Sequence, residues 1–198
     1  DHTRPNPTAV RGVHTDGPEC DAVIMSRTEA APDQARGDLT ERLLAGLPAE
    51  AVLTDPDVTA AYANDKASFC PAGAPAVVVL PRTVEEVQHV MRTATELRVP
   101  VVPQGARTGL SGAANASDGC VVLSLVKMDR ILEISPVDRL AVVEPGVVNA
   151  VLSRAVNEHG LYYPPVPTFD GAFVGGTIAT NAPRAAAFKY GSTRACVD

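Results

Sequence analysis

The stretch that decides the fold is residues 76–112, AVVVLPRTVEEVQHVMRTATELRVPVVPQGARTGLSG. It opens with a β-branched apolar run between two prolines, the pattern of a strand buried on both faces. Thr83, followed three residues later by Glu86, predicts a helix that begins with a capping box. Apolar residues at 101–103 predict a second strand. Residues 76–103 are therefore expected to form one β-α-β unit with a right-handed crossover.

The helix of this unit carries one apolar stripe at helical spacing, which is expected to face the sheet. Its members are Val84, Val87, Val90, Met91, Ala94 and Leu97. His89 falls on the outer face of the helix. After the second strand comes a loop of small residues, QGARTGLSGAANASDG, which contains Gly105, Gly109, Gly112 and Gly119.

Downstream of this loop the chain alternates between apolar runs and turns. The runs predict three strands, at 120–125, 131–135 and 140–143. A helix is expected at 149–159, ending at Gly160, with Val151, Leu152, Ala155 and Val156 facing inward. A rigid proline turn then precedes Gly175-Gly176, which open a short apolar helix.

Upstream, the chain divides into a tail and a collar. Residues 1–37 are Pro-rich without hydrophobic periodicity, which predicts disorder, and Met25 is suspected as the true start. Residues 38–75 are expected to form a helical collar, in which a second helix begins at Asp55-Pro56. The first collar helix is predicted from leucines at helical spacing, which form one buried stripe: Leu39, Leu43, Leu44 and Leu47. Residues 76–198 form the main domain.

Composition narrows the class of protein. The chain has 198 residues with 17 Pro and 15 Gly, too many helix breakers for a coiled coil or a simple helical bundle. A net charge of −6 argues against a nucleic-acid partner, and no apolar stretch is long enough to span a membrane. The four cysteines are far apart, without a CxxC pair or a secretory signal, so we expect a cytoplasmic protein.

Two glycine-rich segments are candidate ligand sites. In the loop, Gly105 and Gly109 bracket Thr108, so the backbone can approach a ligand and its N–H groups can form a nest for an anion. The spacing fits neither a Rossmann turn nor a Walker loop, and a flexible surface loop is the alternative. Gly175 and Gly176 open a helix where a planar or anionic group could press against the backbone. A close helix–sheet contact is the alternative there.

No catalytic set can be assembled from the side chains. The four histidines lie in the tail, on a helix surface or at a helix end, and we assign none of them to catalysis or to a metal. Asp129 and Glu144 lie near strand ends without forming a recognisable carboxylate pair. The catalytic residues are therefore left unknown, no metal is expected, and any chemistry is expected to come from a cofactor.

The order of five motifs resembles a known family. PQGARTGLSGA is followed by VVEPGV, YYPPVPT, VGGTIATNA and KYGSTR, an order similar to that of FAD-binding PCMH-type domains with the vanillyl-alcohol-oxidase fold. Within that family the chain resembles the FAD subunit of glycolate oxidase and the cytochrome-type D-lactate dehydrogenases. The resemblance covers Ala51 to Arg194. It implies an α+β fold of two α/β subdomains, of which the second is incomplete, so that the chain is an N-terminal fragment.

The resemblance also implies a flavin site. By position it assigns FAD binding to Gln104, Gly105, Ala106, Arg107, Thr108, Gly109, Leu110, Ser111, Pro165, Thr168, Gly175, Gly176, Ala179 and Asn181. The glycine loop would wrap the pyrophosphate, while the proline turn and the Gly-Gly helix would line the flavin. Since no histidine lies in the loop, where covalent relatives attach FAD, the cofactor is expected to be non-covalent.

The implied activity is the oxidation of a small 2-hydroxy acid, of the D-lactate or glycolate type, to the 2-oxo acid. The full-length form would pass its electrons to an acceptor protein or a quinone. Two alternatives remain open: a non-catalytic remnant without stable flavin binding, and a flavin reductase of the same fold. Pro183 and Arg184 favour the remnant, because they stand where relatives carry small residues.

Overall fold

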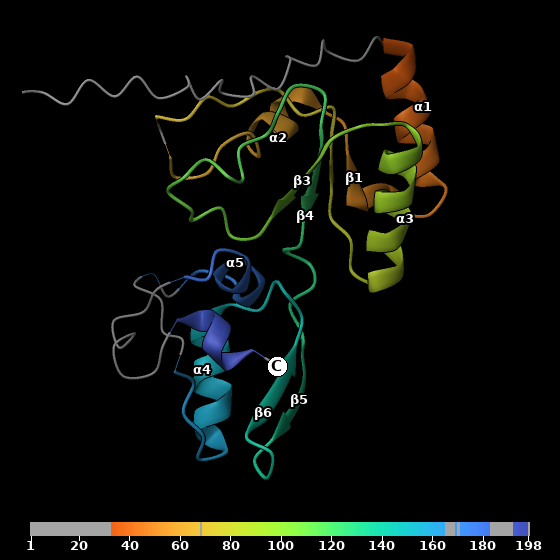
Figure 1. Ribbon diagram of the computed structural model, residues 1–198. Coiled ribbons are helices and arrows are strands. Elements are labelled where there is room, and N and C mark those ends of the chain that lie inside the picture. Colours follow the sequence, from red (N-terminus) through yellow and green to blue (C-terminus); the bar gives the residue numbers. More distant parts are fainter. Residues whose placement is uncertain (1–32, 68, 165–168, 170, 183–191, 198) are drawn as a thin grey trace, which may run out of the picture.

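The computed structural model describes residues 33–67, 69–164, 169, 171–182 and 192–197 (Figure 1). The fold is α+β, as predicted, and comprises two sheets with their own helices. The first sheet has the strand order β1-β2-β4-β3. Its strands are β1 (Val52–Leu53), β2 (Val77–Val79), β3 (Val101–Gln104) and β4 (Val121–Ser124).

The predicted β-α-β unit is present, but its two strands are not neighbours. β4 lies between β2 and β3 and runs parallel to both, with Val122 opposite Val78 on one side and Val102 on the other. β1 extends the sheet antiparallel to β2. β2 and β4 are thus the buried centre of the first sheet, and β3 lies at its edge among the described strands.

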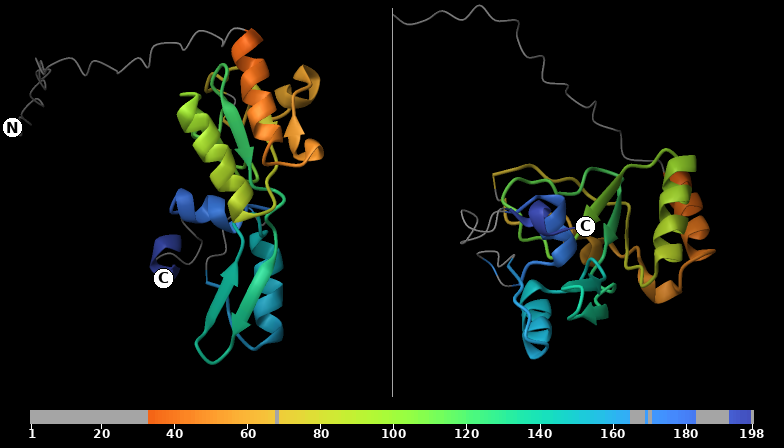
Figure 2. Two further views of the ribbon diagram at one scale, coloured as in Figure 1. Left: turned by 90° about the vertical axis from the view of Figure 1, so that its right-hand side faces the viewer. Right: turned by 60° about the horizontal axis from the view of Figure 1, so that its bottom comes forward.

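Two helices cover one face of this sheet. α1 (Asp33–Leu44) and α3 (Val84–Glu96) lie side by side (Figure 2). Leu43 of α1 and Val90 of α3 are completely buried in one cluster with Val77 and Val121 of the strands. On the other face, Val78 and Val122 pack with Ala116 and Tyr62, which belong to loops. The second face is therefore covered by loops, including the end of the glycine loop.

The N-terminal part differs from the expectation at its start. α1 begins at Asp33, within the segment expected to be disordered, and Arg36 donates a hydrogen bond to the carbonyl oxygen of Pro75. Residues 1–32, including Met25, lie outside the described residues. Leu44 is exposed, unlike the other leucines of its stripe.

Two short helices follow in the collar. They are η1 (Ala49–Ala51), a 3-10 turn, and α2 (Pro56–Ala60). The side chain of Asp55 caps α2 by accepting a hydrogen bond of 2.9 Å from the N–H of Asp57. The predicted Asp55-Pro56 helix start is thereby confirmed.

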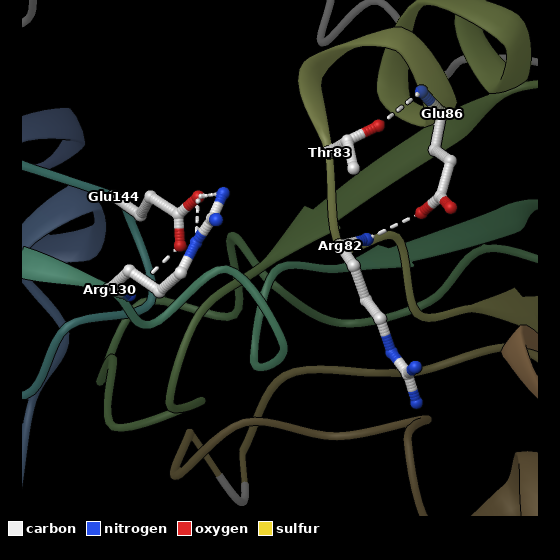
Figure 3. Close-up of polar contacts among 5 residues, drawn as sticks. All are labelled: Arg82, Thr83, Glu86, Arg130 and Glu144. Carbon is white, nitrogen blue, oxygen red and sulfur yellow. Dashed lines mark hydrogen bonds and ion pairs between the residues drawn. The ribbon is translucent and has the colours of Figure 1, made fainter. Parts of the chain in front are cut away.

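The start of α3 is capped on two sides (Figure 3). Thr83 Oγ1 accepts a hydrogen bond from the N–H of Glu86 at 3.2 Å, as the capping box predicts. The Glu86 carboxylate, however, accepts from the N–H of Arg82 at 2.6 Å, one residue before the expected donor. Both interactions occupy main-chain donors that the helix itself cannot use.

The predicted inner stripe of α3 is wrong at two positions. Val84 and Met91 are exposed, because α1 covers only part of the helix surface beyond the sheet contact. His89 does not lie on an outer face: its Nε2 is 2.8 Å from the carbonyl oxygen of Arg42 at the end of α1. It is partly buried between the two helices.

The second unit is built on an antiparallel pair. β5 (Ile131–Ser135) pairs with β6 (Leu140–Val143). α4 (Asn149–Glu158) packs against the pair through Leu152 and Val156, whereas Val151, expected to face inward, is exposed. Gly160 adopts a φ of 72° where α4 ends, as predicted.

The chain then returns toward the first sheet. α5 (Val174–Ala179) lies on the side of the second unit that faces the first sheet (Figure 1), and Val174 joins the core of the second unit. A 3-10 helix, η2 (Thr193–Cys196), follows. Among the described residues, no helix is long and apolar enough to cross a membrane.

The cap of α3 gives the first testable prediction. Thr83→Ala should lower the free energy of unfolding by about 1 kcal/mol, because the N–H of Glu86 loses its side-chain acceptor. Urea denaturation of the purified chain measures this change. Thr95→Ala is the matched control, since Thr95 is exposed on the same helix and should stay within about 0.5 kcal/mol of wild type. Equal losses in the two variants would contradict the capping role.

Candidate functional site

The candidate site is built around the loop that leaves β3. Gln104, the last residue of β3, is 1% exposed, and its Nε2 donates to the carbonyl oxygens of Tyr62 and Ala114, both at 2.7 Å. These bonds tie the beginning of the loop to its end and to the collar. Gln104 was predicted to bind the cofactor, but its side chain is bonded inside the protein, where it braces the loop.

The loop presents unused main-chain donors. Within the described part of the chain, none of the N–H groups of residues 106–111 donates to a protein acceptor. Leu110 and Ser111 are exposed, and Ala106 and Thr108 are half-buried. Such a run of free N–H groups in a non-helical loop is what an anion-binding site requires.

The structure brings the loop and the Gly-Gly helix together. A Cβ placed on Gly105 would lie 3.6 Å from the ring of Phe173 and 3.9 Å from the Cα of Gly176. The loop at the carboxyl end of β3 therefore faces the start of α5. Two segments that are far apart in the sequence are thus close together in space.

The two glycines of α5 have different surroundings. A Cβ on Gly175 would lie 2.6 Å from the Cβ of Pro145 and 3.0 Å from its carbonyl oxygen, and the Gly175 N–H donates to that oxygen at 2.9 Å. Gly175 is thus needed for packing. A Cβ on Gly176 would meet nothing within 4 Å, so Gly176 opens onto free space beside Gly105.

The remaining predicted residues lie around this centre. Gly109 is exposed, and a Cβ there would lie 3.4 Å from Asp65 Oδ2. Ala179 and Asn181, at the far end of α5, line a pocket with Ile178, Arg194 and Val197. Pro165 and Thr168 lie outside the described residues, as do Pro183 and Arg184.

Arg107 has its side chain turned toward the collar. Its Nη1 donates to the carbonyl oxygen of Ala61, and its guanidinium carbon lies 4.8 Å from the centre of the Tyr62 ring. Its φ is 55°, in the left-handed region. The side chain of Arg107, a residue predicted to bind the cofactor, therefore contacts the protein itself.

The sequence did not reveal the role of Glu144. This carboxylate is 7% exposed and accepts hydrogen bonds from Arg130 N at 2.8 Å, Nε at 3.1 Å and Nη2 at 2.7 Å (Figure 3). The Arg130 side chain, as hydrogen-bond donor, holds the pKa of the Glu144 carboxyl below its ordinary value. The only sequence signal was an acidic residue before Pro145-Gly146 in an otherwise apolar strand end.

Glu144 helps to position α5. It begins the turn in which the Pro145 carbonyl oxygen accepts from Gly175, and Gly146 N donates to the Met128 carbonyl oxygen at 2.7 Å. A Cβ on Gly146 would lie 2.3 Å from the carbonyl oxygen of Leu125, so this turn is closely packed. The ion pair thus fixes the support on which the Gly-Gly helix rests.

Two buried acceptors lack a partner. Among the described residues, Asp65 Oδ2 and Gln104 Oε1 are enclosed without a hydrogen bond, and both belong to the segments that hold the glycine loop. In the same part of the chain, no three His, Cys, Asp or Glu side chains are grouped as metal ligands would be.

Comparisons with known proteins agree on one family. A family model described as an FAD binding domain matches residues 75–198. D-2-hydroxyglutarate dehydrogenase of Stutzerimonas stutzeri (strain A1501) is 44% identical over 145 residues, which cover 72% of this chain and 31% of that protein. Glycolate oxidase subunit GlcD of Escherichia coli (strain K12) is 45% identical over 120 residues, covering 60% of this chain and 24% of that subunit. The chain therefore spans less than a third of these relatives.

Solved structures share the fold. Alkyldihydroxyacetonephosphate synthase superposes with a TM-score of 0.72 at 20% identity, over 79% of this chain and 31% of that one. The 4-ethylphenol oxidase from Gulosibacter chungangensis has a TM-score of 0.67 at 25% identity, over 76% of this chain and 30% of that one. The predicted resemblance to PCMH-type flavoproteins is confirmed.

The ion pair behind α5 predicts a pH dependence. Because the folded state lowers the pKa of Glu144, its stabilising effect is present above the ordinary glutamate pKa of about 4.3 and is lost as the pH falls through the lower folded value. Glu144→Gln should therefore lower the free energy of unfolding at pH 7, and the gap to wild type should shrink at pH 3. Urea denaturation at the two pH values measures both gaps.

The matched control for this experiment is Glu133→Gln, which removes an exposed carboxylate from β5. At pH 7 it should stay within about 0.5 kcal/mol of wild type. A gap between Glu144→Gln and wild type that is the same at pH 7 and pH 3 would contradict the electrostatic role of Glu144.

Proposed function

Because this chain belongs to the FAD binding domain family, as its match over residues 75–198 shows, we propose that its glycine loop and the start of α5 form the FAD site. We propose further that this site is the cofactor-binding part of an oxidoreductase acting on a 2-hydroxy acid. The single observation that carries the site assignment is the unused N–H groups of residues 106–111 beside the open backbone of Gly176.

The donor set fits the cofactor. The pyrophosphate of FAD carries two negative charges, which main-chain N–H groups can bind without a basic side chain. A chain with a net charge of −6 can therefore hold it. Since the loop contains no histidine, the proposal is for dissociable FAD.

The residues divide by role in this proposal. Gly105, Ala106, Thr108, Gly109, Leu110 and Ser111 bind the pyrophosphate through their main chain, and Gly176 allows close approach of the ligand. Gln104 and Gly175 support the site from within, through the loop brace and the Pro145 contact. For Pro165, Thr168, Ala179 and Asn181, cofactor binding is proposed from the resemblance alone.

The reaction class rests on the relatives. D-2-hydroxyglutarate dehydrogenase and glycolate oxidase subunit GlcD are named for 2-hydroxy acids, so we propose such an acid, of the D-lactate or glycolate type, as the substrate of the whole protein. Bound FAD would supply the two-electron acceptor for the hydride of the substrate, and an acceptor protein or quinone would receive the electrons. The described residues orient the cofactor. A cytoplasmic location belongs to the same proposal, supported by Cys70 and Cys120, which form no disulfide with a described residue.

The direct test is FAD binding by the purified 198-residue chain. Added FAD should change its fluorescence in a saturable way, and the bound cofactor should survive gel filtration. Because binding stabilises only the folded state, the melting temperature should rise with FAD concentration. A chain that leaves the fluorescence of FAD unchanged would be the non-catalytic remnant instead.

The two helix glycines provide a matched pair of variants. Gly176→Ala should raise the stability of the FAD-free chain by about 0.5–1 kcal/mol, because alanine favours a helix and its Cβ meets open space. The same Cβ should weaken FAD binding about tenfold or more, since it fills the approach to the backbone. Thermal unfolding and fluorescence titration measure the two effects.

In the FAD-free chain, Gly175→Ala should instead lower the free energy of unfolding. Its Cβ would press on Pro145, so we expect a loss of about 1–3 kcal/mol. If Gly176→Ala bound FAD as tightly as wild type, Gly176 would not face the cofactor and the site would be misplaced.

A further inference from the structure

The feature that carries a further inference is the backbone of Arg107. Its φ of 55° lies in the left-handed region, in the middle of the loop with the unused N–H groups. For a residue with a Cβ, this region costs roughly a factor of five to thirty in population. Contacts of the side chain can offset this cost.

The Arg107 side chain makes two contacts that hold its backbone in this conformation. The guanidinium lies over the ring of Tyr62 at 4.8 Å from its centre, and Nη1 donates to the carbonyl oxygen of Ala61. Both partners directly follow α2. We call these three residues, Arg107, Tyr62 and Ala61, the Arg107 latch.

The latch is one of several contacts between the collar and the loop. The Tyr62 carbonyl oxygen accepts from Gln104 at the start of the loop, and the Ala63 carbonyl oxygen accepts at 2.8 Å from Ala116 near its end. Residues 61–63 thus hold the loop at its beginning, middle and end. This segment lies before residues 75–198, the part that the family model matches.

We propose that Arg107 is a positioning residue: its latch holds residue 107 in the left-handed conformation and so keeps the N–H groups of the loop aimed together for the cofactor. The inference rests on the proposed FAD site. A nest of donors forms where successive residues keep an αR–αL or a turn conformation. When a binding-competent loop is only partly populated, the apparent affinity falls by the same fraction.

This role differs from direct binding of phosphate by the arginine charge. If the charge bound phosphate, any residue without it would lose the same affinity. If the side chain acts through the backbone, a residue that adopts a positive φ freely should recover part of the loss. Glycine is that residue, since it populates both signs of φ about equally.

The experiment compares FAD affinity in five forms of the full chain by fluorescence titration. Arg107→Ala should raise Kd about tenfold, because it removes the latch and keeps the cost of the left-handed region. Arg107→Gly should lie within about twofold to threefold of wild type. Tyr62→Leu should raise Kd about twofold to fivefold through loss of the cation–π contact, and Tyr62→Phe should leave it unchanged.

A double variant tests the coupling between the two side chains. Arg107→Ala combined with Tyr62→Leu should bind FAD no more weakly than Arg107→Ala alone, because both changes break the same contact. Additive losses, or an Arg107→Gly variant as weak as Arg107→Ala, would overturn the latch and indicate direct contact of the arginine with the cofactor.

The same variants give a readout that needs no cofactor. In the FAD-free chain, Arg107→Ala should have an unfolding equilibrium constant about fivefold larger than that of Arg107→Gly, since only alanine keeps the backbone cost. Failure of the wild-type chain to bind FAD would overturn the proposed function. Urea denaturation of Arg107→Ala and Arg107→Gly would still test the latch in that case. Equal unfolding constants in the two variants would overturn the latch itself.

Discussion

The first sheet has to be buried on both faces, while helices cover only one of them. Val78, Val122 and Cys120 are fully buried, although none of the described helices contributes to the cluster on their face. The collar after α2 and the end of the glycine loop provide the missing cover. Since buried main-chain groups need hydrogen-bond partners, this cover is tied down by many bonds between the two segments. The loop is part of the core and of the site at once.

The second constraint is the junction between the two units. α5 is fixed by the Gly175–Pro145 contact, and Pro145 belongs to the turn that the Arg130–Glu144 pair holds. The position of Gly176 beside Gly105 therefore depends on an ion pair at the base of β5 and β6. The Gly175–Pro145 contact and the Arg130–Glu144 ion pair of the second unit thus determine where Gly176 faces the first unit.

Much of the fold could be predicted from local patterns, whereas the long-range contacts could not. The apolar run of β2, the Thr83 cap and the stop at Gly160 each carry a residue-type signal. The stripe of α3 was predicted too wide because periodicity cannot tell how much of a helix its neighbours cover. The sequence pointed to both halves of the site through their glycines. It could not separate Gly175 from Gly176, nor show that Gln104 braces the loop, since these roles depend on main-chain partners that leave no pattern.

The place of β4 between β2 and β3 bears on how the chain folds. Among the described strands, β3 pairs only with β4, so β3 has no ladder partner until the chain has passed through the whole glycine loop. When β3 pairs with β4, the glycine loop is also brought over the face of the sheet that the loops cover. The pairing of β3 within the first sheet and the closure of the glycine loop are thus coupled steps of folding, because the strand that pairs with β3 follows the loop in the chain.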